Sequence, residues 1–298
     1  MQLAEKAEEK IKEDIHQKYI TKETCTIFGK GLLMGTADII PGISGGTIAL
    51  ITGIYERLIG AISGIDFKFI AYFLKGDFKR TWENIKNIDF ALFIPLVSGI
   101  GLAILLMSNI IHYLLENMTA LSYAFFFGTI LSSAVVIHRK EDKLAIKNFP
   151  PLIFGFLFAF LLVGLPALQI EHSLFNLFAS GIVAICAMIL PGISGAAILL
   201  LLNQYEYMLF ALKNMQLLEI CVFSLGALIG ILSFSRFVKF LLRKYKSFTM
   251  CFLIGLMIGA LRLPYQEITK TIDSIFPVLI SGLFGFAIVF VLETKFGR

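Results

Sequence analysis

The residues that could bind a ligand are concentrated in two similar motifs, Pro41–Thr47 (PGISGGT) and Pro191–Ala197 (PGISGAA). Each motif interrupts a stretch of apolar residues. Proline lacks a backbone N–H donor and glycine adopts conformations that other residues avoid, so each motif is expected to break a helix. The N–H groups at the start of the helix that follows a break attract anions such as phosphate. The two motifs therefore predict an anion site formed by two broken helices.

Hydroxyl groups and glycines within the motifs supply the expected contacts. In the first motif Ser44 and Thr47 offer hydroxyls, and the glycines between them let backbone N–H groups approach a ligand closely. The second motif offers fewer groups, since two alanines replace the last glycine and the threonine. Close helix packing by small residues is the alternative explanation of both motifs. The expected phosphate-binding residues are Ser44, Gly45, Gly46, Thr47, Ser194 and Gly195, and the helix-breaking residues are Pro41, Gly42, Pro191 and Gly192.

A phosphate also needs cationic partners, and two arginines lie in or next to apolar stretches. Arg236 is the deepest cation within the stretch 217–242, and Arg262 lies at the end of the next stretch. Arginine can hold a phosphate with two parallel hydrogen bonds. The alternative for both is that the long side chain extends to the membrane surface. Arg236 and Arg262 therefore join the candidate phosphate ligands.

Three carboxylates are candidates for coupling or for structural roles. Asp38 stands three residues before Pro41 in apolar sequence, where a carboxylate is costly and usually functional. It could cap the helix break, or it could bind a coupling proton or cation. Glu56 and Glu206 follow the two motifs at equivalent positions, and each could instead lie at the membrane surface. Arg57 follows Glu56 directly, which would permit an ion pair there.

The composition identifies an integral membrane protein. Of the 298 residues 57% are hydrophobic and 16% charged, and the mean hydropathy is +0.84, whereas soluble domains are about 45–50% apolar. The histidines and cysteines are scattered, and the sequence has no G-x-x-x-x-G-K-[ST] nucleotide motif. We therefore expect no metal and no cofactor. The net charge of +5 is expected to come from cytoplasmic loops, so nucleic acid is not an expected partner.

Membrane helices must position the two motifs. Each motif lies between two apolar pieces that are shorter than the roughly 20 residues of a spanning helix. We therefore expect two re-entrant hairpins, with a single kinked spanning helix as the alternative at each motif. The predicted elements are an amphipathic cytoplasmic N-terminal arm over 1–24, hairpins over 27–62 and 175–212, and spans over 91–114, 120–138, 151–169, 217–242, 248–263 and 275–293.

The chain also consists of two similar halves. The motifs are 150 residues apart (191 − 41), and beyond the hairpins the offset becomes 127, as for Gly99 and Gly226. We predict a first repeat over 25–169 and a second repeat over 170–298. Three spans per half is an odd number, so the halves would have opposite orientations. The predicted fold is an all-α integral membrane protein with an inverted-topology repeat, each half containing one re-entrant hairpin and three transmembrane helices.

The distribution of basic residues predicts which side faces the cytoplasm. In this topology the loops 63–89, 139–149 and 243–247 lie on one side, and each contains a cluster of Lys and Arg. The loops 115–119 and 170–174 lie on the other side and contain neither residue. Because cytoplasmic loops are enriched in Lys and Arg, we expect both termini in the cytoplasm.

The motifs, extended to Asp38–Thr47 (DIIPGISGGT) and Pro191–Gly195 (PGISG), resemble those of the DUF368 family, the bacterial polyprenyl-phosphate transporters. The resemblance covers nearly the whole chain after residue 24. It implies a flippase that returns undecaprenyl phosphate, the lipid carrier of cell-wall synthesis, from the outer to the inner leaflet of the bacterial plasma membrane. The phosphate would dock between the hairpins during alternating access. The lipid and the bilayer are the expected partners, and a homo-oligomer is left open.

Two other functions remain as alternatives. Undecaprenyl-pyrophosphate phosphatases also resemble inverted repeats with re-entrant hairpins and a Pro-Gly-x-Ser motif. Their motif continues with Arg-Ser, where this chain has Gly45 and Gly46. Without an arginine to stabilise a transferring phosphoryl group, enzyme activity is not expected. A small-anion or ion transporter is the second alternative, and the sequence excludes it least well.

Overall fold

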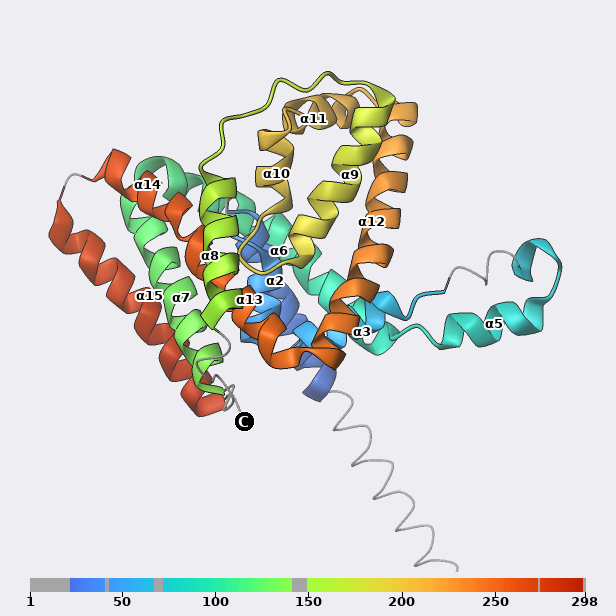
Figure 1. Cartoon of the computed structure of the whole chain (residues 1–298), viewed down its shortest axis with the longest axis horizontal. Helices are drawn as coiled ribbons and strands as arrows, with labels where there is room; N and C mark the ends of the chain where they lie inside the picture. The colour runs from blue at the N-terminus through green and yellow to red at the C-terminus, as the bar shows by residue number, and fades with distance from the viewer. Residues whose placement is uncertain (1–21, 41–42, 67–71, 141–148, 273, 297–298) are drawn as a thin grey trace, which may run out of the picture.

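A computed structural model of the chain describes residues 22–40, 43–66, 72–140, 149–272 and 274–296. Pro41, Gly42 and most of the predicted N-terminal arm lie outside this part. The regular elements of the described residues are all helices (Figure 1). After an N-terminal helix over 22–38 they are α2 (Gly45–Ile51), α3 (Tyr55–Ser63), α5 (Phe78–Lys86), α6 (Phe90–Asn117), α7 (Thr119–Lys140), α8 (Phe149–Val163), α9 (Leu174–Ile189), α10 (Gly195–Leu201), α11 (Tyr205–Lys213), α12 (Leu217–Lys244), α13 (Lys246–Ala260), α14 (Arg262–Thr271) and α15 (Ile275–Phe296).

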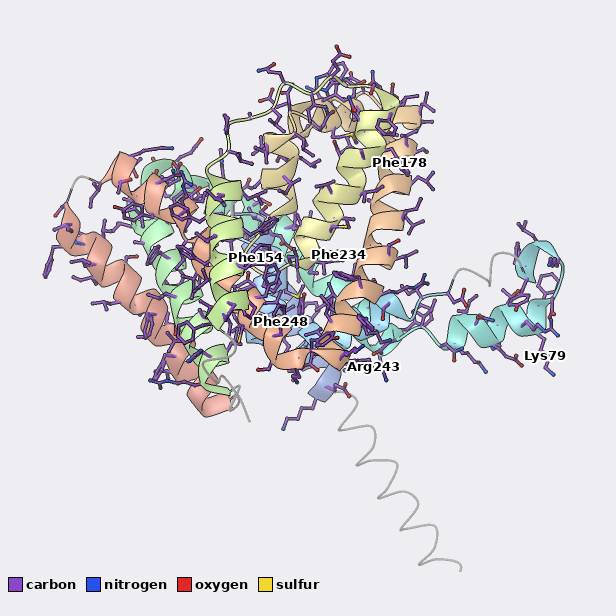
Figure 2. All side chains as sticks on the ribbon, in the orientation of Figure 1. Lys79, Phe154, Phe178, Phe234, Arg243 and Phe248 are labelled. Atoms are coloured by element: carbon purple, nitrogen blue, oxygen red, sulfur yellow. The ribbon has the colours of Figure 1, made fainter. Side chains whose placement is uncertain are left out.

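The lengths and surfaces of these helices suit a lipid bilayer. Four described helices are long and apolar enough to cross a membrane: Phe90–Asn117, Thr119–Arg139, Leu217–Lys244 and Lys246–Thr271. The pair α10 and α11, bent by 104°, would make a fifth if it is one broken span. Large apolar side chains cover the outside, among them Phe154 on α8, which is 64% exposed (Figure 2). Exposing such an apolar surface to water is unfavourable, whereas contact with the hydrocarbon of a bilayer is favourable. The chain is therefore an all-α, multi-pass membrane protein.

Two helices of 15 or 16 residues, α8 and α9, are apolar but shorter than a typical span. The helix α8 ends at Val163, whereas the sequence predicts a span to residue 169. Residues 164–173 run instead as an extended segment along the upper edge of the molecule in Figure 1. Gly164 follows α8 directly, and Pro166 has no N–H to donate to a helical hydrogen bond. These two residues explain why α8 ends at Val163.

Glycines let the helices pack with their backbones in contact. The N-terminal helix lies against α6, where Gly31 touches the carbonyl of Leu96 and Gly99 touches the carbonyl of Phe28. A side chain at either glycine would collide with this backbone, so the sequence sets the distance between the helices. The pair α9 and α12 repeats the contacts at equivalent positions, through Gly181 with Phe223 and Gly226 with Phe178.

The helix boundaries recur at the two offsets found in the sequence. The start and end of α10 and α11 lie 150 residues after those of α2 and α3, and those of α12 lie 127 residues after those of α6 (217 − 90). Even the turns correspond. Gly53 joins α2 to α3 at a φ of 73°, and Asn203 joins α10 to α11 at a φ of 58°. Glycine and asparagine are the residues that most readily adopt this left-handed conformation.

The two halves are also interleaved. The helix α7 packs along α15, and α8 packs along α13, so each pair joins a helix of the first half to one of the second. In Figure 1 the N-terminal helix rises from the lower edge, and α2 and α3 return to that edge. The helix α9 descends from the upper edge, and α10 and α11 return upward. The helix breaks at the two turning points therefore lie inside the molecule.

Candidate functional site

The two helix breaks contact each other in the interior. The backbone N–H of Gly192 donates a hydrogen bond to Thr47 Oγ1 at 2.8 Å, and both groups are buried. Ser44 Oγ lies 3.5 Å from the carbonyl oxygen of Met188 and donates to it. Gly46 faces the same backbone segment, since a methyl group on Gly46 would lie 3.1 Å from the carbonyl oxygen of Met188. Residues separated by about 145 positions thus form a single polar centre.

The second break depends on glycine at its corner. Gly192 has a φ of +90°, a conformation that residues with a side chain rarely adopt. A methyl group at this position would lie 2.9 Å from Cα of Met257 on α13. Pro191, which precedes it, is fully buried. The corner therefore packs directly against the backbone of a membrane-crossing helix.

In the first break the backbone N–H groups at the start of α2 already donate hydrogen bonds to side chains of the same chain. Asp38 Oδ1 accepts a hydrogen bond from the N–H of Gly45 at 2.6 Å. Ser44 Oγ accepts another from the N–H of Gly46 at 3.1 Å, which is the usual cap of a helix start. Asp38 thus caps the break in this conformation, and its carboxylate stands where an anionic ligand of α2 would bind.

The second break is different, because Met188 replaces the aspartate (38 + 150). Ser194 precedes α10 as its N-cap, but its side chain makes no capping hydrogen bond, although the residue is only 8% exposed. It lines an apolar cavity of about 350 Å³, together with the adjacent Gly192. The other lining residues are Leu162, Val163, Leu165, Ala167, Ile193, Ala197, Ile198, Leu200, Leu201 and Leu263. Gly195 starts α10 next to this cavity.

Arg262 does not line this cavity, but its guanidinium lies against Gly164, between the lining residues Val163 and Leu165. The guanidinium donates to the carbonyl of Phe160 on α8 at 2.7 Å, and its carbon lies 4.4 Å from the centre of the Phe160 ring. Any side chain at Gly164 would displace this group. A guanidinium carries five donors, and this carbonyl takes one of them. Arg262 is therefore held at the end of α8 with donors to spare.

Arg236 has a different location. It is exposed on α12 and donates to the carbonyl of Ile65, just beyond α3, at 3.3 Å. The structure places it just beyond α3, whereas Arg262 lies at the end of α8. The two arginines predicted as phosphate partners are therefore not brought together in this conformation.

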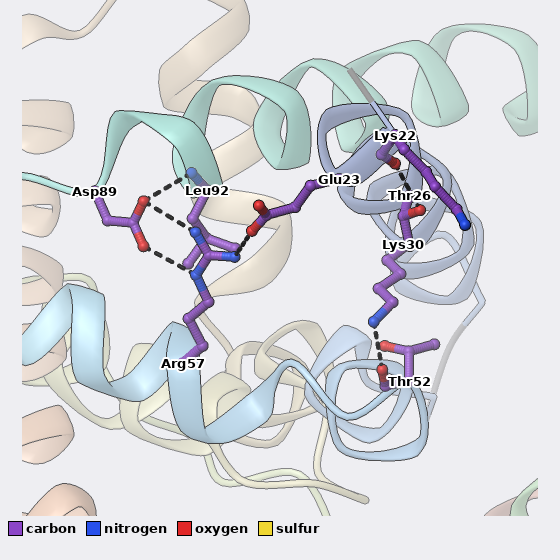
Figure 3. Close-up of polar contacts among 8 residues, drawn as sticks. All are labelled: Lys22, Glu23, Thr26, Lys30, Thr52, Arg57, Asp89 and Leu92. Atoms are coloured by element: carbon purple, nitrogen blue, oxygen red, sulfur yellow. Dashed lines mark hydrogen bonds and ion pairs between the residues drawn. The ribbon is translucent and has the colours of Figure 1, made fainter. Parts of the chain in front are cut away.

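The glutamates lie at opposite hairpins and have different surroundings. Glu56 forms an ion pair with Lys246 at the start of α13, at 2.6 Å. Arg57 does not pair with Glu56, as the sequence allowed, but bridges Glu23 at 2.6 Å and Asp89 at 3.0 Å (Figure 3). The bridge ties the first hairpin to the N-terminal helix and to the start of α6, so the geometry favours it over a neighbour on the same helix. Glu206 is exposed on α11.

Two interior polar residues escaped the sequence analysis. Lys30 Nζ donates to the carbonyl of Thr52 at 2.6 Å and fixes the turn after α2 (Figure 3). A single lysine within the apolar stretch 27–40 was the signal that could have identified it. Gln204 is fully buried and holds the segment before α9 through the carbonyls of Ile170 and Glu171 and the ring of His172. No repeat match could reveal Gln204, because the first half has an isoleucine at that position.

The fold and the centre together define a class: a multi-pass helical membrane protein whose two broken helices meet in the interior. Comparison with known proteins identifies the family. The chain belongs to the family described as VCA0040-like, undecaprenyl phosphate translocase-like, whose model matches residues 34–276 and so includes both breaks. The resemblance to the DUF368 family seen in the sequence is thereby confirmed.

Two relatives carry the name polyprenyl-phosphate transporter. The one from Vibrio cholerae serotype O1 (strain ATCC 39315 / El Tor Inaba N16961) is 40% identical over 232 residues, 78% of this chain and 74% of its own length. The one from Staphylococcus aureus (strain NCTC 8325 / PS 47) is 29% identical over 278 residues, 87% of this chain and 92% of its own length. No solved structure matches the chain. Both relatives are named as transporters and not as enzymes.

Proposed function

We propose that this protein is a flippase that returns undecaprenyl phosphate from the outer to the inner leaflet of a bacterial plasma membrane for cell-envelope synthesis. The family and the two relatives named polyprenyl-phosphate transporter support the choice of lipid. The observation that carries the proposal is the hydrogen bond from Gly192 to Thr47, which joins the two helix breaks inside a membrane protein. A polar centre at that depth provides a path for a charged headgroup that hydrocarbon alone would exclude.

The mechanism we infer is alternating access by an inverted repeat with two re-entrant hairpins. Its support is the recurrence of helix boundaries at offsets of 150 and 127 residues, and the return of each hairpin to the edge from which it started (Figure 1). Such repeats can exchange conformations, so that one site opens to each side in turn. Clusters of basic residues in the loops of the lower edge favour a cytoplasmic location for that edge and for both termini.

In this mechanism the phosphate binds between the breaks, and the contacts of the present conformation must open to admit it. The proposed ligands are Ser44, Gly45, Gly46, Thr47, Ser194, Gly195, Arg236 and Arg262. Asp38 would leave Gly45 when the phosphate arrives, because two anions cannot share one helix start. Protonation of Asp38 would weaken its hold on that N–H, which makes this residue our candidate for coupling to a proton or cation. Glu56 and Glu206 would act at the two surfaces.

The test is transport of labelled undecaprenyl phosphate in proteoliposomes. We expect the wild type to flip the lipid, and Ser44→Ala and Arg236→Ala to reduce the rate about tenfold, as expected for the loss of about 1.5 kcal/mol of hydrogen bonding at the site. The matched control is Thr26→Ala, which also removes a hydroxyl bonded to a helix carbonyl but lies exposed at the start of the N-terminal helix. Absence of flipping by the wild type, with uptake of inorganic phosphate in its place, would show a small-anion transporter.

A further inference from the structure

We propose that the cavity between α8 and α10 binds the first isoprene units of the lipid, while Ser194 and Arg262 hold its phosphate. This inference rests on the proposed function and adds to it a specific subsite for the chain next to the headgroup. The subsite lies on the side of the second break that faces α8, and it adjoins the corner residue Gly192, whose N–H bonds to the first break. It would give the protein a way to recognise a single methyl-branched chain.

The size and lining of the cavity fit a short piece of branched hydrocarbon. Its volume of about 350 Å³ lies at the lower end of the range of about 300–1,000 Å³ found for ligand pockets. Aliphatic side chains of α8, of the segment that follows it, of the second break, of α10 and of the start of α14 form most of its wall. Leu165 and Leu200 at the wall are 51% and 48% exposed. The cavity therefore connects the interior to the lipid-facing surface, so that a long tail could leave while its first units stay bound.

The polar groups of the cavity are located where the phosphate end would lie. Ser194 is nine-tenths buried, lines the cavity and makes no capping hydrogen bond. The Arg262 guanidinium lies against Gly164, between the lining residues Val163 and Leu165, and it uses one of its five donors on the carbonyl of Phe160. A hydroxyl and a guanidinium at the border of an apolar cavity match a phosphate monoester joined to a hydrocarbon chain.

The asymmetry of the two breaks explains why this subsite belongs to the second one. At the first break Asp38 and Ser44 occupy the N–H groups of α2. Thr47 of the first break bonds to the second break through its side chain. The equivalent residue of the second break is Ala197, which lines the cavity. The second break therefore has no internal anion and has a small residue where the first has a hydroxyl. Both differences leave room for a ligand.

The experiment measures binding to the full chain in nanodiscs with three soluble probes: inorganic phosphate, geranyl phosphate and dihexanoyl phosphatidic acid. We expect geranyl phosphate to bind at least about tenfold more tightly than inorganic phosphate, because its two isoprene units bury apolar surface. We expect phosphatidic acid, with two acyl chains, to bind about tenfold more weakly than geranyl phosphate. Ala197→Phe fills the cavity and should remove the advantage of geranyl phosphate while leaving inorganic phosphate within about twofold.

Two further variants keep the test decisive. Leu209→Phe places the same ring on α11, where Leu209 is 50% exposed and does not line the cavity, and it should bind geranyl phosphate as the wild type does. Ser194→Ala should weaken inorganic phosphate and geranyl phosphate by a similar factor. If Ala197→Phe misfolds by size-exclusion chromatography, Leu200→Trp takes its place at the more exposed wall.

The outcomes separate this subsite from the function on which it rests. Equal binding of geranyl phosphate by the wild type and Ala197→Phe, or equal binding of geranyl phosphate and phosphatidic acid, would overturn the subsite. Either result together with flipping of undecaprenyl phosphate in proteoliposomes would leave the proposed function intact. Failure of the wild type to flip that lipid would instead reject the function.

Discussion

At the level of single residues, the two motifs share a sequence pattern but differ in their partners. Ser44 and Thr47 are engaged with the other break, and Asp38 caps the helix that follows. Ser194 makes no capping bond and faces a cavity. The sequence singled out these residues because Pro and Gly in apolar surroundings favour a break in a helix. It could not predict their pairing, which depends on contacts across about 145 residues.

The carboxylate of Asp38 provides the first prediction. Asp38→Ala should lower the free energy of unfolding by about 1–2 kcal/mol, because the N–H of Gly45 loses its partner. Asp38→Asn keeps an oxygen acceptor but no charge, so it should preserve most of the stability and still slow transport. Thermal unfolding in detergent and flipping in proteoliposomes measure the two effects. Asp77→Ala is the control, since Asp77 caps α5 in the same way on an exposed segment. Normal transport by Asp38→Asn would restrict Asp38 to a structural role.

The corner at Gly192 provides the second prediction. Gly192→Ala should lower the free energy of unfolding by about 1–3 kcal/mol, since the residue must keep a φ of +90° and the new methyl would press on Met257. A thermal unfolding midpoint well below that of the wild type is the expected result. Gly101→Ala on α6 is the matched control, because nothing lies within 4 Å of the added methyl group. A glycine in a helix costs about 1 kcal/mol relative to alanine, so this control should be neutral or stabilising.

At the level of helices, the two hairpins are not equally engaged. The helix α3 packs against α12 of the other half, with Arg236 bonded to Ile65 and Glu56 paired with Lys246. Its counterpart α11 packs against α12 of its own half and does not pack along α6 in the same way. An exposed ion pair contributes only about 0–1 kcal/mol, so packing holds α3 on α12 more than the ion pair does.

The third prediction concerns a chemical cross-link between α3 and α13, at the ion pair of Glu56 with Lys246. In a chain without its native cysteines, Glu56→Cys with Lys246→Cys should accept a short bis-methanethiosulfonate reagent, which joins the two thiols through disulfides, since the native side chains meet at 2.6 Å. We expect the cross-link to stop flipping and a reductant to restore it. The control pair is Glu267→Cys with Lys270→Cys, whose native side chains meet at 2.7 Å within one helix. Continued transport by the first cross-linked pair would show that α3 does not move relative to α13.

The helices themselves were largely predictable from the sequence. Apolar stretches of spanning length and the Pro-Gly breaks gave most of the elements, because hydrocarbon requires helices and proline interrupts them. The end of α8 at Val163 was not predicted, since the following residues remain apolar. Arg236 was predicted to bind phosphate, and in this structure it donates to the carbonyl of Ile65 just beyond α3. Depth along a helix can be read from sequence, but the face that a long side chain uses depends on its neighbours.

At the level of the whole molecule, the repeat makes a prediction about a second conformation. The partners Glu56 and Lys246 correspond by the two offsets to Glu206 (56 + 150) and Thr119 (246 − 127). If the halves exchange conformations, Glu206→Cys with Thr119→Cys should cross-link only when the first pair is open. Chains already cross-linked between positions 56 and 246 should therefore fail to form it. Quantitative mass spectrometry of doubly labelled chains tests this, and both cross-links in a single chain would contradict the exchange.

The interleaving of the halves was beyond the reach of the sequence. Repeats at constant offset indicated two similar units, but they did not show that α7 would pack with α15 and α8 with α13. Glycine positions record these contacts only once the partners are known. Gly128, for example, touches the backbone of Gly282, and Gly155 touches that of Phe252. Small residues permit close approach to many helices, so pairing depends on the three-dimensional arrangement.

This interleaving has a consequence for biosynthesis. The helix α8 leaves the ribosome well before α13, its packing partner, which begins at Lys246, about a hundred residues after the start of α8 at Phe149. At about 5–20 residues per second, the nascent α8 must wait in the lipid for roughly 5–20 seconds. The face of α8 that carries Gly155 has no packing partner during that time, and the same holds for α7, which begins at Thr119, until α15 begins at Ile275. The first half is therefore completed only by the second, and insertion factors that shelter unpaired helices would have their greatest effect in that interval.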